Sequence, residues 1–374
     1  MRTAAVFAPV ALLSFVSVFV ACSDSAGSKS DAGAGDAGDD VTGAFDTGTE
    51  LDVAVPASGR VYVRLTGTPA VVTPADPKND PSGWDLAFEG LEAYTNSGPS
   101  GAGGVQGFGP LDAVAFLDDN APQVPFLTSD KTGGAFLRWY FYDGSNHVLD
   151  SRFHVYGVKS GDKTYKVQVL DYYGEQAGAP VSALYRLRWA EVTAAGTGTV
   201  HDDPTIDGTA GGPTAPASSP STCIDFTTGT KSLLTESAAL QSSAWDLCFR
   251  RENISVNGEL GGPRGTGAVD LDADKTAGET LSVVNAKTPE SEQAHFDGVD
   301  ANALANQTFR GDRVVSAFSN LWIEKGSNPP APAKAAWFVT AADLKSKFLV
   351  GFARFDGATA TSPGTIVMRI KPVH

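Results

Sequence analysis

The sequence predicts an all-β fold of two tandem antiparallel β-sandwich-like modules, and three observations carry that prediction. Glycine and proline are frequent, at 41 and 22 of 374 residues, which favours strands joined by turns. The stretches RVYVRL, TYKVQVLDYY and LYRLRW place apolar residues at every second position over part of their length. That period is typical of half-buried antiparallel strands. A Trp-Asp-Leu motif occurs twice, so we expect one unit of roughly eight strands to be built two times.

Residues 1–21 are predicted to be a secretory signal peptide, which is removed from the mature chain. Arg2 provides the short basic segment, and a long apolar run ending in a small residue follows it. The run FVAC resembles a bacterial lipobox, which would make Cys22 the lipidated first residue. The alternative is an ordinary signal peptide with an incidental cysteine. Ser23 stands where the lipoprotein sorting pattern would place Asp for inner-membrane retention. The predicted location is therefore the bacterial cell envelope, lipid-anchored at the outer membrane.

Residues 22–44 are predicted to be an acidic, flexible tether between the lipid anchor and the first module. The stretch SDSAGSKSDAGAGDAGDD is built from small and acidic residues with one Lys, and it has no large apolar side chain. Such a segment cannot bury enough surface to offset the entropy of ordering it. Its like charges keep it extended.

The repeat begins with the Trp-Asp-Leu motif. WDLAF at Trp84 matches WDLCF at Trp245, and the same offset of 161 residues carries Asn96 onto Asn257. A buried Trp beside an Asp that accepts turn amides suits a core corner. The glycines after each Asn permit positive φ and close backbone approach. We therefore interpret the motif as structural.

Farther along, the offset between the copies grows to 182 residues. DGSNHVLDSRFHVYGV at 143–158 then matches KGSNPPAPAKAAWFVT at 325–340. Between the copies, residues 193–220 are rich in Gly, Ala, Thr and Pro without periodicity, which is typical of a linker. The predicted modules are 45–192 and 221–374.

Cys223 and Cys248 are predicted to form a disulfide. The offset of 161 places Tyr62 opposite Cys223 in the alignment. Cys223 thus falls on the strand before the Trp-Asp-Leu strand, which carries Cys248. Neighbouring strands can be bridged, and an oxidising envelope favours pairing. Two buried thiols are the alternative.

Taken in order, these motifs resemble the HmuY-like haem-binding lipoproteins. WDLAF, YTNSG with a Gly-Gly pair, WYFYDGSNHVL, a TYKVQV strand and YYG follow one another in the first module. The second module keeps the Trp-Asp-Leu and Asn/Gly motifs and then diverges. The resemblance implies a lipid-anchored all-β protein that captures haem at the outer surface of bacteria. It also implies haem as cofactor and haem-carrying proteins of a host or the environment as partners.

Haem iron is bound axially by imidazole, Met sulfur, thiolate or Tyr. His147 and His154 lie in the segment of the first module that matches best, and their counterparts are Pro329 and Ala336. Haem binding is therefore expected in the first module. His147 is the better ligand because it follows a GSN turn, where a loop can present a side chain. In one straight strand the two histidines would lie about 23 Å apart on opposite faces. Both can bind one iron only if the chain turns between them.

Tyr172 and Tyr173 are the substitutes available for a second ligand, because the segment YYGEQAGAP contains no His or Met. The alternative is that both histidines are surface or hydrogen-bonded residues. The chain would then be a non-haem surface-binding or structural lipoprotein that keeps the fold without the iron ligands.

An acidic stretch in the second module raises the question of a metal. Asp270, Asp272 and Asp274 are spaced like the start of a calcium loop. Lys275 stands where the sharp turn of such a loop needs Gly, and Leu281 stands where a bidentate Glu is needed. A weak calcium site and a solvated acidic loop both remain open.

Other chemistries are excluded or unsupported by the sequence. The formal net charge of −15 argues against nucleic acid, since phosphate binding needs a cationic surface. No nucleophile elbow and no Cys-x-x-Cys pair occur. We expect a protein that is not an enzyme and that meets the membrane through its lipid anchor.

Overall fold

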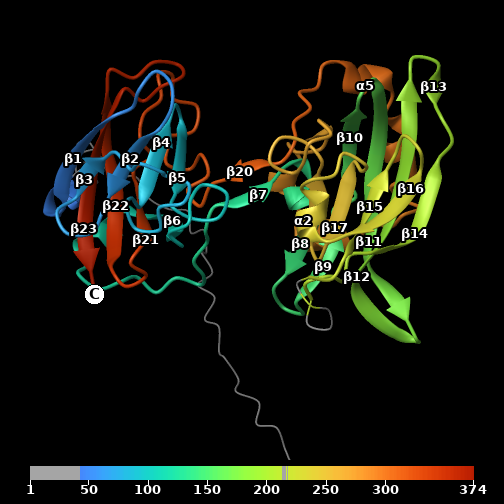
Figure 1. Cartoon of the computed structure of the whole chain (residues 1–374), viewed down its shortest axis with the longest axis horizontal. Coiled ribbons are helices and arrows are strands. Elements are labelled where there is room, and N and C mark those ends of the chain that lie inside the picture. The colour runs from blue at the N-terminus through green and yellow to red at the C-terminus, as the bar shows by residue number, and fades with distance from the viewer. Residues whose placement is uncertain (1–42, 213–215, 217) are drawn as a thin grey trace, which may run out of the picture. The chain divides into compact units, whose positions relative to one another are not determined.

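The computed structural model describes residues 43–212, 216 and 218–374 (Figure 1). It confirms the all-β class, with several antiparallel sheets. No helix in this part of the chain is both long and apolar enough to cross a membrane. The predicted signal peptide, Cys22 and nearly all of the predicted tether lie outside the described residues.

Four short strands near the N-terminus form one sheet, in the order β3-β2-β4-β5. Its strands are β2 (Val61–Arg64), β3 (Ala70–Val72), β4 (Leu86–Glu89) and β5 (Glu92–Thr95). The strand that follows the first Trp-Asp pair is buried along most of its length, because both of its faces are covered.

A second sheet joins the two ends of the described chain, in the order β1-β23-β22-β21-β6. Figure 1 shows β1, at the blue end of the colour scale, beside the red β23. The strands are β1 (Thr49–Ala54), β6 (Gln106–Asp112), β21 (Ala335–Thr340), β22 (Lys347–Asp356) and β23 (Thr365–Val373). Buried side chains of both sheets form one core. We call this sandwich, residues 43–130 and 316–374, body 1.

A further four-stranded sheet has the order β16-β15-β17-β18. Its strands are β15 (Ser221–Asp225), β16 (Thr230–Leu234), β17 (Leu247–Arg250) and β18 (Asn253–Val256). This order repeats that of β3-β2-β4-β5, with the strand after the second Trp-Asp pair in the place of β4.

The partner of this sheet has the order β13-β12-β11-β10-β19, and β14 also pairs with β12. Its strands are β10 (Val155–Ser160), β11 (Lys163–Gln176), β12 (Ala179–Thr193), β13 (Gly196–Thr197), β14 (His201–Asp207) and β19 (Gly267–Asp270). Residues 201–207 of the predicted linker are thus a strand of the sheet. The two sheets share one core, and we call this second sandwich, residues 134–312, body 2.

Short helices and one hairpin complete the two bodies. Body 1 has η1 (Phe45–Thr47) and η2 (Ala113–Leu117). Body 2 has the hairpin β8 (Tyr140–Asp143) and β9 (Val148–Ser151). Its helices are η3 (Ala135–Arg138), α2 (Glu236–Ala239), η4 (Thr276–Gly278), α3 (Leu281–Asn285), α4 (Gln293–Gly298) and α5 (Ala301–Ala305).

The two Trp-Asp pairs occupy equivalent corners, as the repeat predicts. Trp84 and Trp245 are fully buried. The Asp85 carboxylate accepts the Leu65 amide at 2.6 Å, and the carboxylate of its counterpart Asp246 accepts the Phe226 amide at 2.8 Å. The structural interpretation of the motif is therefore supported at atomic detail in both copies.

Glycine is required beside Asn96, which follows the first motif. The Asn96 amide donates to the carbonyls of Asp80 and Trp84, and its oxygen accepts the Gly103 amide. A Cβ on Gly101 would lie 2.1 Å from the Asn96 amide oxygen. The glycine cluster therefore leaves room for the buried Asn96 to hold the loop by hydrogen bonds. We interpret the cluster as a structural turn beside the core.

Two short segments connect the bodies. They are β7 (Lys131–Gly133) and β20 (Arg313–Val315), and they pair antiparallel with each other. At the offset of 182 these segments are equivalent parts of the two repeats. We call this two-stranded ladder the crossing.

The sheets do not follow the module boundaries at 45–192 and 221–374. Body 1 combines the first half of the first repeat with the second half of the second repeat. Body 2 combines the two remaining halves, and its strand order β14-β12-β11-β10-β19 corresponds to β1-β23-β22-β21-β6. The boundaries therefore describe the repeat in the sequence, whereas the compact bodies arise by exchange of halves.

Candidate functional site

His147 lies at the end of the β8–β9 turn with an exposed side chain and a left-handed backbone (φ 61). Its Nδ1 lies 2.5 Å from the Tyr142 hydroxyl. Its Nε2 has no hydrogen-bond partner among the described residues. One ring nitrogen is therefore accessible from solvent.

His154 is placed very differently, because its side chain is buried and both ring nitrogens face carboxylates. Nδ1 lies 2.9 Å from Asp270, and Nε2 lies 3.1 Å from Glu279. Only a ring with a proton on each nitrogen can donate to both carboxylates at once. Neither nitrogen is free for iron in this arrangement. The structure thus separates the two predicted histidine ligands into an exposed turn and a buried polar cluster.

The two tyrosines are also engaged. Tyr172 is buried beside Trp139 and Tyr185, and burial raises its pKa to about 12. The Tyr173 hydroxyl accepts the Leu149 amide at 3.0 Å. A tyrosine binds iron most readily as phenolate, and burial opposes that form at Tyr172.

The three aspartates of the predicted calcium loop do not converge. Asp270 holds His154, while Asp272 accepts from His295 at 2.7 Å and from Lys275 at 2.7 Å. Asp274 is exposed and outside this arrangement. Within the described ranges, no group of three or more His, Cys, Asp or Glu side chains is placed to hold a metal ion.

Glu279 joins these groups into one network that we call the His154 cluster. Besides facing His154, its carboxylate lies 2.6 Å from Arg152 and 2.6 Å from Lys287. Burial acts to raise the pKa of Glu279, but the hydrogen bonds from Lys287 and Arg152 outweigh it and leave the pKa lowered. Asp272 follows the same rule, since burial acts to raise its pKa but the hydrogen bonds from His295 and Lys275 leave it lowered.

The His154 cluster connects the end of β9 to the segment that follows β19. A cavity of about 350 Å³ lies beside it. It is lined by Phe153, His154, Asp272, Lys275, Gly278, Glu279, Val283, Lys287, Glu292 and His295. The buried carboxylates of the cluster already have cationic partners, so no ligand is needed to compensate their charge. We therefore interpret the cluster as a structural contact between the end of β9 and the segment that follows β19.

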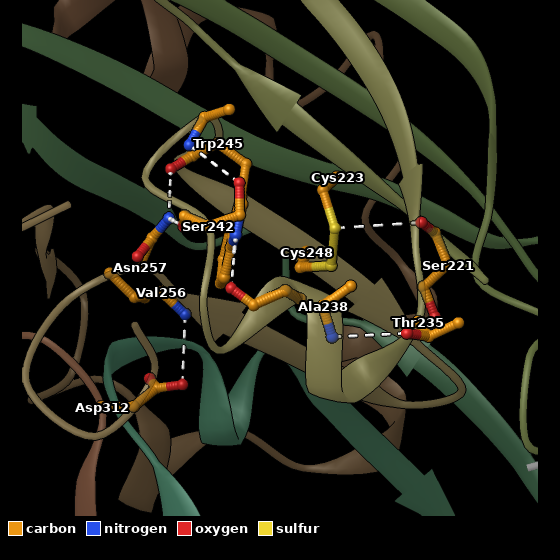
Figure 2. Close-up of a disulfide and its surroundings, with 12 residues drawn as sticks. Ser221, Cys223, Thr235, Ala238, Ser242, Trp245, Cys248, Val256, Asn257 and Asp312 are labelled. Atoms are coloured by element: carbon orange, nitrogen blue, oxygen red, sulfur yellow. Dashed lines mark hydrogen bonds between the residues drawn. A yellow bond between two sulfur atoms is a disulfide. The ribbon is translucent and has the colours of Figure 1, made fainter. Parts of the chain in front are cut away.

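The predicted disulfide is confirmed. Cys223 in β15 and Cys248 in β17 are directly opposite in the ladder and are bonded through sulfur (Figure 2). Trp245 packs in the same small cluster, and its indole donates to the Ala239 carbonyl. The bridge therefore reinforces the second Trp-Asp corner.

Body 1 carries a cavity of about 590 Å³ beside β22. Buried Phe45, Pro330 and Phe352 contribute apolar surface, and Phe355 adds a half-buried ring. The full lining is Phe45, Glu324, Pro329, Pro330, Ala331, Pro332, Lys334, Phe352, Ala353, Arg354, Phe355, Gly357 and Ala358. None of these side chains is a His, Met, Cys or Tyr, so the cavity offers no axial ligand for iron. We call it the proline pocket.

Sequence reasoning missed this pocket. In the alignment of the repeats Pro329 is only the counterpart of His147, and the run Pro329–Pro332 carries no side chain that by itself indicates a site. Its signal was the proline run followed by two phenylalanines at Phe352 and Phe355. The pocket needs both stretches, together with Phe45 from the other end of the chain.

Comparisons with known proteins add no assignment. No protein-family model matches the chain, and no curated protein is significantly similar to it. The proposed role therefore rests on the site geometry and on the motifs in the sequence.

Proposed function

We propose that the chain is a lipid-anchored, non-catalytic binding protein of the bacterial envelope. Its ligand is a small, mostly apolar molecule that carries a carboxylate, held in the proline pocket without iron coordination by the protein. The volume of about 590 Å³ is typical of small-molecule sites, which combine an apolar lining with a few polar groups. This pocket is the observation that carries the proposal.

The charge at the pocket supports an anionic group on the ligand. Lys334 is exposed at the lining and forms no ion pair within the described ranges. Arg354 is partnered by the neighbouring Asp356, and Glu324 is the one carboxylate in the lining. The unpaired ammonium of Lys334 lies beside the apolar lining of the pocket, so it could bind a carboxylate at the edge of a bound molecule.

The envelope location rests on Cys22 and the acidic segment behind it. The variant Cys22→Ala should move the protein from the membrane fraction to the soluble fraction, because the acyl anchor is lost. Unchanged association with membranes would contradict lipid anchoring at this residue.

Haem capture through His147 is the second candidate. The observation in its favour is the exposed imidazole, whose Nε2 is free of hydrogen-bond partners within the described part of the chain. A single imidazole can hold haem iron from one side. This site would lie in body 2, away from the residues of the proline pocket in sequence.

Titration with haem and with metal-free protoporphyrin IX separates the two candidates. Trp322 packs on Phe352 and Phe355, so its fluorescence reports a porphyrin in the proline pocket. We expect both porphyrins to bind, with a response that survives His147→Ala and is lost in Ala353→Trp, which fills the pocket. Binding of haem alone, with a Soret shift abolished by His147→Ala, would instead establish haem capture. Absence of binding for both compounds would reject both candidates for porphyrin ligands.

A further inference from the structure

Two aspartates stand at the crossing, and the repeat makes them equivalent. Asp130 precedes β7 and Asp312 precedes β20, at the offset of 182. Both are almost completely buried. Each accepts the amide of the last residue of the neighbouring strand, Thr95 in β5 and Val256 in β18. The same residue type therefore performs the same task on the two sides of the crossing.

Asp130 is fully partnered. Its carboxylate accepts the Thr95 amide at 3.0 Å, the Thr95 hydroxyl at 2.8 Å, the Ser100 hydroxyl at 2.6 Å and the Ala317 amide at 2.9 Å. Ala317 comes from the other repeat, so Asp130 also joins the exchanged halves. Burial raises the pKa of Asp130 above 3.8, and these donors oppose that rise by stabilising the ionised carboxylate.

Asp312 has a poorer environment. Its Oδ2 accepts the Val256 amide at 3.1 Å, as Figure 2 shows, while its Oδ1 has no partner. Its own amide and carbonyl bond to Gly258 and Leu260. The residue therefore holds the start of β20 to the end of β18 and to the segment that follows it through three hydrogen bonds, and it leaves one buried oxygen unpaired.

A cavity of about 60 Å³ adjoins Asp312 and has room for water. The charged and titratable groups around Asp312 do not compensate a negative charge on it. Glu259 repels it and is itself paired with Arg310. The remaining groups on the neighbouring elements are Lys131, Tyr140 and Glu252, which line the cavity, and Arg313, which follows in β20.

We propose that Asp312 is a pH-sensitive switch of the crossing, which holds β20 to β18 while its carboxyl is protonated and loosens when the carboxyl ionises. A buried charge without a partner is costly, and the opened state lets water solvate it. The switch concerns the joint between the bodies and does not depend on the ligand proposed above.

The direction of the pH effect follows from linkage. Burial raises the pKa of Asp312 from 3.8 to about 7. Between these values the folded state binds a proton that the unfolded state lacks. The stability associated with Asp312 is therefore fully present below about pH 4 and is lost as the pH rises through about 7.

Hydrogen exchange of the Val256 and Leu260 amides tests the switch in the full chain. After correction for intrinsic exchange, we expect their protection to fall by up to about tenfold per pH unit between about pH 4 and pH 7, and to level off above pH 7. Asp312→Asn cannot ionise and should remove this dependence. Glu259→Gln removes the like charge, so it should ease ionisation of Asp312 and make the fall in protection level off at lower pH.

The repeat offers an internal control. Thr95 bonds to Asp130 as Val256 bonds to Asp312, so its amide should show a much smaller pH dependence, and Asp130→Asn should leave the behaviour of Val256 in place. An equal dependence at Thr95 would overturn the proposal. So would protection of Val256 that rises with pH, or identical behaviour of wild type and Asp312→Asn. Glu259→Gln keeps the test decisive should Asp312→Asn fail to fold.

Discussion

Thr132 in β7 lies directly opposite Val314 in β20, and these two residues are equivalent positions of the repeat. An antiparallel ladder whose central pair joins a residue to its own counterpart is locally two-fold symmetric. The two repeats therefore pass each other at this point and close on each other's halves. This arrangement makes body 2 one continuous segment and body 1 a pairing of the two chain ends.

Cleavage between the repeats tests the exchange. A protease site placed at 213–217 divides the chain into two fragments, and each body then contains strands from both. We expect the fragments to stay together after cleavage, with the native size of the uncut chain by light scattering. The disulfide does not contribute, because Cys223 and Cys248 lie in the same fragment. Two separate folded fragments would show that each repeat closes on itself.

Lys166 should be a large contributor to the stability of body 2. Its buried ammonium donates to the carbonyls of Phe296, Asp297 and Val299 at the end of α4. Burial lowers its pKa. Lys166→Met leaves these carbonyls without their donor and should cost about 2–4 kcal/mol in urea unfolding. Lys163→Met, at an exposed ion pair with Glu191, should cost under about 1 kcal/mol. Equal effects of the two variants would contradict the assigned role.

Glu279 should stabilise the His154 cluster in a pH-dependent way. Glu279→Gln removes the charge that Arg152, Lys287 and His154 face, and should cost about 3 kcal/mol near neutral pH. Because the pKa of Glu279 is lowered from 4.5, its contribution is present above that value and is lost as the pH falls through the lowered pKa. The difference between wild type and variant in urea unfolding should therefore shrink below about pH 4. A difference that is constant with pH would argue against this account, and Glu191→Gln serves as the exposed control.

The disulfide should stabilise the second Trp-Asp corner. Cys223 and Cys248 are separated by 25 residues, and closing such a loop is worth about 3 kcal/mol in the chain-entropy model. The double variant Cys223→Ala/Cys248→Ala should lose about that amount and should no longer respond to reductant. Labelling of both thiols in unreduced, denatured protein would show that the bridge is absent from the isolated protein.

Much of the local structure was predictable because short sequence motifs determine it. The Trp84–Asp85 and Trp245–Asp246 pairs, with the Asn residue that follows each, make equivalent hydrogen bonds in both copies. Their offset also placed Cys223 on the strand next to the one that carries Cys248, as the structure confirms. Alternation of apolar residues predicted the strands for the same reason, since a half-buried strand needs only its own pattern.

The partners of the predicted site residues were not predictable. His154 meets Asp270 and Glu279 more than a hundred residues away in sequence, and nothing near His154 announces two carboxylates. The proline pocket likewise needs Phe45 beside Pro330 and Phe352. Such contacts depend on which distant segments fold together, so the residue types alone left their roles open.

The sequence by itself determined that the chain is all-β, that it repeats, and that its two Trp-Asp corners are built alike, because these properties follow from local patterns. Only the tertiary structure decided which half pairs with which. Strands β10 and β21 are equivalent in the repeat, and so are β6 and β19. Either member of the first pair could therefore bind either member of the second, and the strand patterns do not distinguish self-closure from exchange. In the structure the exchange takes place over the few residues of the crossing, beside which the Asp130 carboxylate accepts the amide of Ala317 from the other repeat.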